Sequence, residues 1–134
     1  MSRSSEAGEN RSHKLGRRGE KLAAKYLRRV GIKVLYRNFR APRGGEVDLV
    51  CRDGDELVFV EVKTRSTRDY GSPASAVNRE KQALIARGAL AWLRLLDNPD
   101  LIFRFDILEV VIDESGESFH LIRAAFALPE PHRY

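Results

Sequence analysis

Hydrophobic and polar residues alternate along the chain in patterns that predict two helices and five strands. From Lys14 to Val30 the apolar residues recur at helical spacing, and Gly31 is a natural helix stop. A second helical pattern follows Asn78, a residue type that favours the helix N-cap, and runs to about Leu96. Strand patterns are found at residues 32–40, 46–52, 57–65, 101–113 and 118–127.

This order, α-β-β-β-α-β-β, predicts an α/β fold: a central mixed β-sheet of about five strands flanked by helices, because each strand has an apolar face that needs cover. The predicted domain covers residues 14–127. The polar residues 1–13 are expected to form a disordered N-terminal arm, and residues 128–134 a C-terminal tail. Residues 66–77, rich in Ser, Gly and Pro, are predicted to form a loop.

The net charge of +5 is unevenly distributed along the 134 residues. Residues 1–45 hold 13 Lys and Arg against 3 Asp and Glu. A basic first third favours a polyanionic partner such as nucleic acid, although a solvated helix face with a charged tail explains the charge equally well. No apolar run resembles a membrane span or a signal peptide, so we expect no membrane partner and a cytoplasmic location. The single cysteine, Cys51, cannot form an internal disulfide.

Charged residues interrupt two otherwise apolar strands in the segment GGEVDLVCRDGDELVFVEVKTRS, residues 44–66. A hairpin whose loop is residues 53–56 pairs residues whose numbers sum to 109, which places Asp48 opposite Glu61 and Glu46 opposite Lys63. Because side chains alternate across a strand, the expected faces of the first strand are Glu46, Asp48 and Val50 on one side and Val47, Leu49 and Cys51 on the other.

Two carboxylates directly opposite each other weaken an ordinary sheet, whereas a divalent cation between them removes that cost. With oxygen ligands and no Cys or His nearby, Asp48 and Glu61 predict Mg²⁺ or Mn²⁺. Lys63 is then placed to orient water or to stabilise charge on a phosphate. The alternative is a surface hairpin with exposed ion pairs, but the apolar residues on both faces of the second strand favour burial.

The helices offer further polar candidates near this hairpin. Glu20 borders the apolar stripe of the first helix, so it can either reach the carboxylates over the sheet edge or pair with a surface Lys or Arg. Lys81 and Gln82 are similarly placed on the second helix, where a solvated face is the more frequent explanation. We expect Cys51 and Trp92 to be core residues.

The order of these residues resembles a known nuclease signature. Asp48, then Glu61-Val62-Lys63 on the following strand, after a helix that carries Glu20, resembles the PD-(D/E)XK pattern. More closely, the segments GRRGEKLAAKYL, NFRAPRGGEVDLV, LVFVEVKTRS, YGSPASAV and RFDILEV resemble the YraN-like family of small bacterial proteins, which is similar to archaeal Holliday-junction resolvases. This resemblance covers residues 15 to about 127. Two positions depart from the superfamily pattern: Val47 stands in place of Pro, and Gln82 is followed by Ala86 in place of Tyr.

The resemblance implies a restriction-endonuclease-like core and an Mg²⁺- or Mn²⁺-dependent endonuclease acting on DNA, including branched repair or recombination intermediates, with a homodimer as a further expectation. It implies catalytic roles for Glu20, Asp48, Glu61 and Lys63, and metal ligation by Asp48 and Glu61, with Glu46 and the Val62 carbonyl as further ligands. Nucleic-acid contacts are expected from Arg17, Arg18, Arg40, Arg43, Arg65 and Arg68, which flank the motifs. The alternatives are a non-catalytic nucleic-acid-binding module with the same fold and an RNA-directed nuclease.

Overall fold

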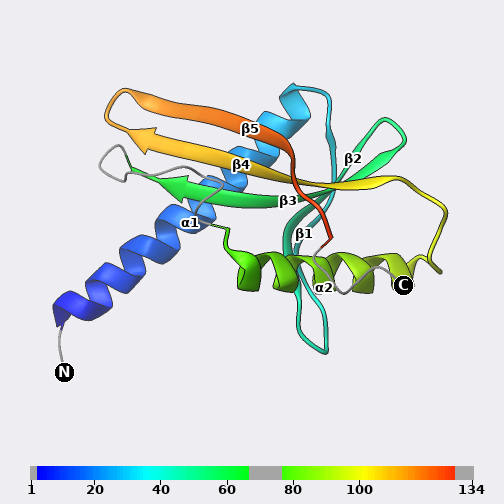
Figure 1. Cartoon of the computed structure of the whole chain (residues 1–134). Helices are drawn as coiled ribbons and strands as arrows, with labels where there is room; N and C mark the ends of the chain where they lie inside the picture. The colour runs from blue at the N-terminus through cyan, green and yellow to red at the C-terminus, as the bar shows by residue number, and fades with distance from the viewer. Residues whose placement is uncertain (1–2, 67–76, 129–134) are drawn as a thin grey trace.

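The structure is a computed structural model that describes residues 3–66 and 77–128 (Figure 1). Its elements are α1 (Arg3–Arg29), β1 (Lys33–Arg40), β2 (Glu46–Asp53), β3 (Glu56–Arg65), α2 (Arg79–Leu95), β4 (Phe103–Asp113) and β5 (Gly116–Phe126). The predicted α/β class and the order α-β-β-β-α-β-β are confirmed.

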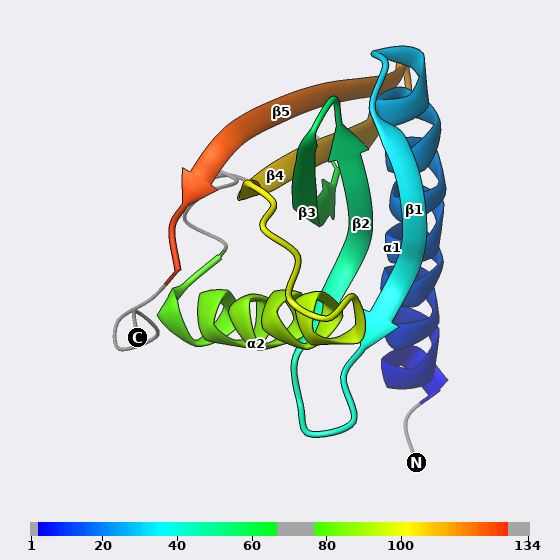
Figure 2. The same ribbon diagram turned by 90° about the vertical axis from the view of Figure 1, so that its right-hand side faces the viewer.

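The five strands form one mixed sheet in the order β1-β2-β3-β4-β5. Only β3 and β4 run parallel, and the other neighbouring strands are antiparallel. The helix α2 supplies the crossover between β3 and β4, as a parallel pair requires. Helix α1 runs along one face of the sheet and α2 lies across the other (Figure 2).

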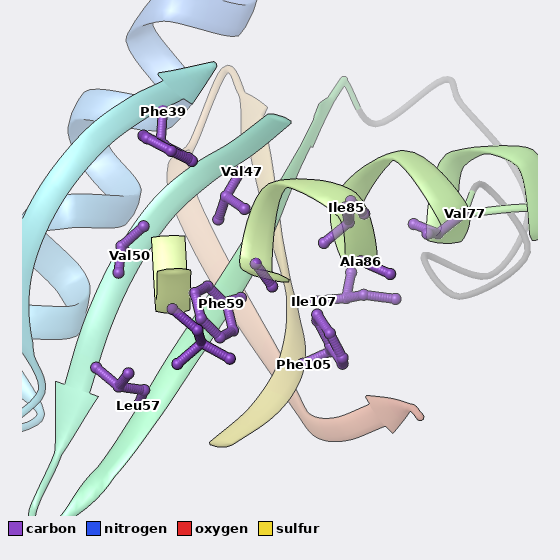
Figure 3. Close-up of a cluster of buried hydrophobic side chains, with 12 residues drawn as sticks. Phe39, Val47, Val50, Leu57, Phe59, Val77, Ile85, Ala86, Phe105 and Ile107 are labelled. Carbon is purple, nitrogen blue, oxygen red and sulfur yellow. The ribbon is translucent and has the colours of Figure 1, made fainter. Parts of the chain in front are cut away.

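Each helix covers a separate hydrophobic cluster. Under α1, Ala23 and Leu27 pack against the β3 residues Val58 and Val60. Under α2, a second cluster is built around Phe59, again from β3 (Figure 3). The strand β3 is therefore buried on both faces, as its apolar composition predicts. This burial matters for the site because Glu61 lies in the same strand.

The hairpin of β2 and β3 has the predicted register over part of its length. The pairs run from Asp53 with Glu56 to Leu49 with Val60, and every pair of residue numbers sums to 109. The ladder ends there, before the predicted pairs of Asp48 with Glu61 and Glu46 with Lys63. At that point the Val62 N–H donates a 2.8 Å hydrogen bond to Asp48 Oδ2, so that a side chain takes the place of the next backbone acceptor.

One part of the predicted face assignment is wrong. Leu49 and Cys51 lie in the cluster under α1, but Val47 packs with Val50 under α2. The side chains of β2 thus do not alternate strictly between Val47 and Leu49, and the neighbouring strand β1 is irregular at the same level, where Asn38 has a φ of 57°. Asparagine tolerates this left-handed conformation better than most residues. Asp48 lies between Val47 and Leu49, at the point where the alternation of β2 breaks.

Several boundaries differ from the prediction. Helix α1 begins at Arg3 and not at Lys14, so residues 3–13 are helical where the sequence predicts a disordered arm. These residues contain no proline, and a helix already fixed by packing extends more easily than it nucleates. The Asn78 cap is confirmed, since its side chain accepts the Lys81 N–H. Most of the predicted loop and of the C-terminal tail, residues 67–76 and 129–134, lie outside the described residues. Within the described chain, neither helix is long and apolar enough to cross a membrane.

Candidate active site

Three acidic residues lie near enough to influence one another where β2 and β3 separate. Glu61 on β3 is only 4% exposed, and Asp48 on β2 is half-buried. Glu20 comes from α1 and is also half-buried. Burial and then the charge of Asp48 raise the pKa of Glu20, while a hydrogen bond with Asn38 acts in the opposite direction. The side chain of Glu20 therefore reaches over the sheet edge to the strand acids.

The electrostatic environment of Glu61 is the most perturbed in the site. Burial raises the pKa of Glu61 strongly, and the adjacent Asp48 carboxyl adds to the increase through a hydrogen bond and through its charge. The positive charges of Lys81 and Lys63 act in the opposite direction but do not cancel it. Without a further cation, Glu61 therefore holds a proton near neutral pH.

Lys81 is the residue of this site that sequence reasoning undervalued. Its Nζ lies 2.5 Å from Glu46 Oε1 and 3.8 Å from Glu61 Oε2. Burial acts to lower the pKa of Lys81, but the hydrogen bond to Glu46 and the charges of Glu61, Glu46 and Asp48 raise it overall. The ammonium group is therefore a fixed positive charge among the carboxylates, and not part of a solvated helix face.

Glu46 has different neighbours from those predicted. One carboxylate oxygen accepts from Lys81 and the other accepts from Arg40 Nη1 at 2.7 Å. The hydrogen bond from Lys81 is the largest cause of the lowered pKa of Glu46. Because both oxygens already have cationic partners, Glu46 must give up one of them before it can bind a metal. Its role as a ligand stays a prediction.

Close contacts at glycine residues place both helices against the site. A Cβ atom on Gly19 of α1 would lie 1.7 Å from Thr64 Oγ1 on β3. A Cβ atom on Gly88 of α2 would lie 2.8 Å from the Glu46 backbone nitrogen. Gly45, with a φ of +105°, completes the second contact. The first contact brings Glu20 to the sheet, and the second holds Lys81 over Glu46.

The lysine predicted in β3 and the N–H of Val62 also lie beside the acids. Lys63 is half-buried and close enough to Glu61 for its charge to act on the pKa of that carboxyl. Val62 is 9% exposed, its side chain packs under α1, and its N–H holds Asp48. The structure thus brings together Glu20, Asp48, Glu61 and Lys63, the four residues predicted to be catalytic.

The donor set fits a hard divalent cation. Carboxylate oxygens are the ligands that Mg²⁺ and Mn²⁺ prefer, and Mg²⁺ commonly uses one or two protein carboxylates together with water and substrate phosphate. Within the described residues, no three Asp, Glu, His or Cys side chains are already gathered closely enough to hold a metal ion. The residues present therefore suit a two-carboxylate site made by Asp48 and Glu61, in which a cation would replace the proton of Glu61.

The arginines predicted to contact nucleic acid are placed in different environments. Arg17 and Arg40 line a surface hollow of about 410 Å³ beside Glu20. Arg65 forms an ion pair with the buried Glu109, and its side chain is only 20% exposed. Arg18 pairs with Glu117 on the surface, and Arg43 is exposed in the β1–β2 loop. Arg68 lies outside the described residues.

Comparison with known proteins identifies the family. Residues 19–110 match the sequence profile described as "Uncharacterised protein family UPF0102". The chain belongs to the UPF0102 family. It is 52% identical over 107 residues to a UPF0102 protein of Geobacter sulfurreducens, a match that covers 78% of this chain and 83% of that protein.

Two further UPF0102 relatives show similar coverage. The chain is 50% identical over 105 residues to a protein of Parafrankia sp., covering 78% of this chain and 88% of that protein. It is 44% identical over 119 residues to a protein of Chlorobaculum tepidum, covering 84% and 91%. The family part of the resemblance noted in the sequence is confirmed, and the UPF0102 match spans the site from Glu20 through Lys81.

Proposed function

We propose that this UPF0102 protein is an Mg²⁺- or Mn²⁺-dependent endonuclease that hydrolyses phosphodiester bonds in DNA, with branched repair or recombination intermediates as its substrates. The observation that carries the proposal is the buried Glu61 beside Asp48 and Glu20, with Lys63 and Lys81 at hand. Acidic pairs of this kind, strongly perturbed by burial and by each other, are typical of active sites.

Each residue then has a distinct task. Asp48 and Glu61 would hold the ion, and the Val62 N–H keeps Asp48 in place. When bound, the ion supplies a Lewis acid for the scissile phosphate and lowers the pKa of a bound water. Lys63 stabilises negative charge that develops on the phosphate or orients the attacking water. Glu20 completes the acidic shell beside Asp48.

The proposal includes a restriction-endonuclease-like core and a nuclease ancestry, on the basis of the PD-(D/E)XK resemblance in the sequence. Branched substrates suit a two-fold homodimer, because symmetric subunits place one site on each of two strands. A DNA substrate also agrees with the cytoplasmic location that the sequence predicts.

A second candidate function is nucleic-acid binding without cleavage. The observation that favours it is Lys81, whose ammonium group already compensates Glu46 and approaches Glu61 without any metal. In that case the acids and Lys81 would form a structural ion cluster, and the basic surface would carry the function.

Cleavage of a substrate panel decides between these functions. Purified protein is incubated with linear duplex, single-stranded DNA, a four-way junction and RNA, each with Mg²⁺, Mn²⁺ or a chelator. We expect metal-dependent cutting of DNA, strongest on the junction, and loss of cutting in Lys63→Ala and Glu61→Ala. Binding without cutting under every condition would favour the second candidate, and cutting confined to RNA would replace the substrate class.

A further inference from the structure

An arginine-lined groove lies on the other side of the Gly45–Gly88 contact from the acidic residues. It is formed by the β1–β2 loop and the C-terminal half of α2, and it encloses about 600 Å³. An adjoining hollow of about 210 Å³ extends it along the helix. Arg43, Arg87 and Arg94 line these two hollows, and we call them together the arginine groove.

The three arginines of this groove are exposed. Within residues 13–66 and 77–128, none of them forms an ion pair or a side-chain hydrogen bond. Other arginines of the molecule behave differently: Arg40 and Arg65 are each paired with a glutamate. Three exposed guanidinium groups without a carboxylate partner create a positive local potential, which attracts an anion.

The floor of the groove is apolar and fixed. Pro42, Ala91 and Leu95 line it between the arginines. The loop above it is closed by two backbone hydrogen bonds, from the Ala41 N–H to the Gly45 carbonyl at 2.9 Å and from the Gly44 N–H to the Ala41 carbonyl at 3.1 Å. In both ribbon views the loop extends past α2 (Figures 1 and 2). These two bonds hold the backbone on either side of Arg43, and α2 carries Arg87 and Arg94.

The spacing of the arginines suits a phosphate chain. Arg87 and Arg94 are seven residues apart on α2, which is roughly 10 Å along the helix axis. Successive phosphates of one duplex strand advance about 3.4 Å along the axis, so this span matches about three of them. Arginine also binds phosphate through two parallel hydrogen bonds, which an ammonium group cannot do.

We propose that the arginine groove binds the phosphodiester backbone of a nucleic-acid strand that continues from the acidic site, an inference that rests on the proposed function. The Gly45–Gly88 contact places Glu46, which is bound to Lys81, directly beside the loop of the groove. A strand whose scissile phosphate lies at Glu61 thus passes the start of β2 and enters the groove. The groove adds affinity and direction to the strand without reading its sequence.

The test measures binding without cleavage. Fluorescence anisotropy of labelled duplex, four-way junction and single-stranded DNA is recorded in a chelator over a range of salt concentrations. The test variant is Arg43→Gln, Arg87→Gln, Arg94→Gln in one chain. The matched control is Arg28→Gln, Arg29→Gln, Lys33→Gln, which removes the same charge from exposed positions. These positions lie where α1 ends and β1 begins, at the other end of β1 from the loop of the groove (Figure 2). Melting temperatures show that both variants are folded.

We expect the groove variant to bind DNA about tenfold or more weakly at moderate salt, and the slope of log affinity against log salt to fall by about 2 to 3. The control variant should lose clearly less DNA affinity, and its salt slope should fall clearly less. Equal losses in the two variants, or no binding by the wild type, would overturn the proposal. So would a groove variant that loses affinity for polyglutamate but keeps it for DNA, because the groove would then suit an acidic protein.

The same data separate this inference from the proposed function. If the wild type cuts nothing with any metal but the groove variant loses DNA affinity, the groove stands and the nuclease activity fails. If the wild type cuts DNA and the groove variant binds as the control does, the nuclease stands and the groove fails.

Discussion

Replacement of Gly19 by alanine tests whether the close contact between α1 and β3 builds the site. A Cβ atom at residue 19 would lie 1.7 Å from Thr64 Oγ1 and 2.7 Å from both Thr64 Cβ and Cγ2. Rotation of the threonine side chain moves its Oγ1 and Cγ2 but leaves its Cβ in place. Helix α1 must therefore move away from β3. Gly16 in the same helix has no atom within 4 Å of the equivalent position and provides a matched control.

The two substitutions should change stability in opposite directions. Alanine in a helix interior is favoured over glycine by about 0.5–1 kcal/mol, so Gly16→Ala should stabilise the protein by about that amount. Gly19→Ala gains the same helix propensity but incurs the overpacking cost, which is typically about 1–3 kcal/mol. The net effect at Gly19 is a loss of up to about 2 kcal/mol, and the two variants should differ by the overpacking cost, about 1–3 kcal/mol.

Urea denaturation measures this difference in the free energy of unfolding. Cleavage assayed well below the unfolding midpoint then reports the site, because the shift of α1 carries Glu20 away from Asp48. We expect Gly16→Ala to keep wild-type cleavage and Gly19→Ala to lose most of it while still folded. If Gly19→Ala is as stable as Gly16→Ala, the contact of α1 with Thr64 does not exist as described.

Three further predictions concern the charges and the thiol. Folding raises the pKa of Glu61, so the metal-free folded protein holds a proton that the unfolded chain releases above about pH 4.3. The free energy of unfolding should therefore fall as the pH rises from there towards the folded-state pKa. Thermal melts across pH 5–9 should show a flatter fall in Glu61→Gln. A fall as steep in Glu61→Gln as in the wild type would show that another group causes it. Lys81→Met should destabilise the metal-free protein by about 1–2 kcal/mol, because the ammonium group no longer compensates the carboxylates. For the same reason, Mg²⁺ should stabilise this variant more than it stabilises the wild type. Equal effects of Mg²⁺ on the two denaturation curves would contradict this. Burial raises the pKa of the Cys51 thiol to about 12, so thiol reagents at pH 8 should label the protein only in denaturant, and rapid labelling of the native state would place Cys51 outside the core.

The sequence was sufficient for what depends on local periodicity. Alternating apolar residues marked all five strands, and the length of the turn between β2 and β3 set the register that Leu49 and Val60 show. The Asn78 cap followed from residue type and position. The sequence predicted Glu20 at the border of the apolar stripe of α1 but left open whether its side chain meets the strand acids or a surface cation. Only the packing of Gly19 against Thr64 decides between these two environments.

The remainder depended on contacts between distant segments. Val47 was assigned to the wrong face because the side chains of β2 do not alternate strictly between Val47 and Leu49, and the residue types there carry no signal of that break. Lys81 was undervalued because only the tertiary contact of Gly45 with Gly88 brings it to Glu46. Gly45 lies in the β1–β2 loop and Gly88 in α2, far apart in the sequence, so no local sequence pattern predicts their contact.

The most direct test of the central hypothesis is the rate of DNA cleavage as a function of Mn²⁺ concentration, compared between the wild type and Glu61→Gln. Gln keeps the size of the side chain but removes the charge that, with Asp48, holds the ion. We expect a rate that saturates with Mn²⁺, disappears with chelator and falls by about 100-fold or more in Glu61→Gln. Equal rates in the two proteins, or cleavage that persists in chelator, would contradict a metal-dependent site at Asp48 and Glu61.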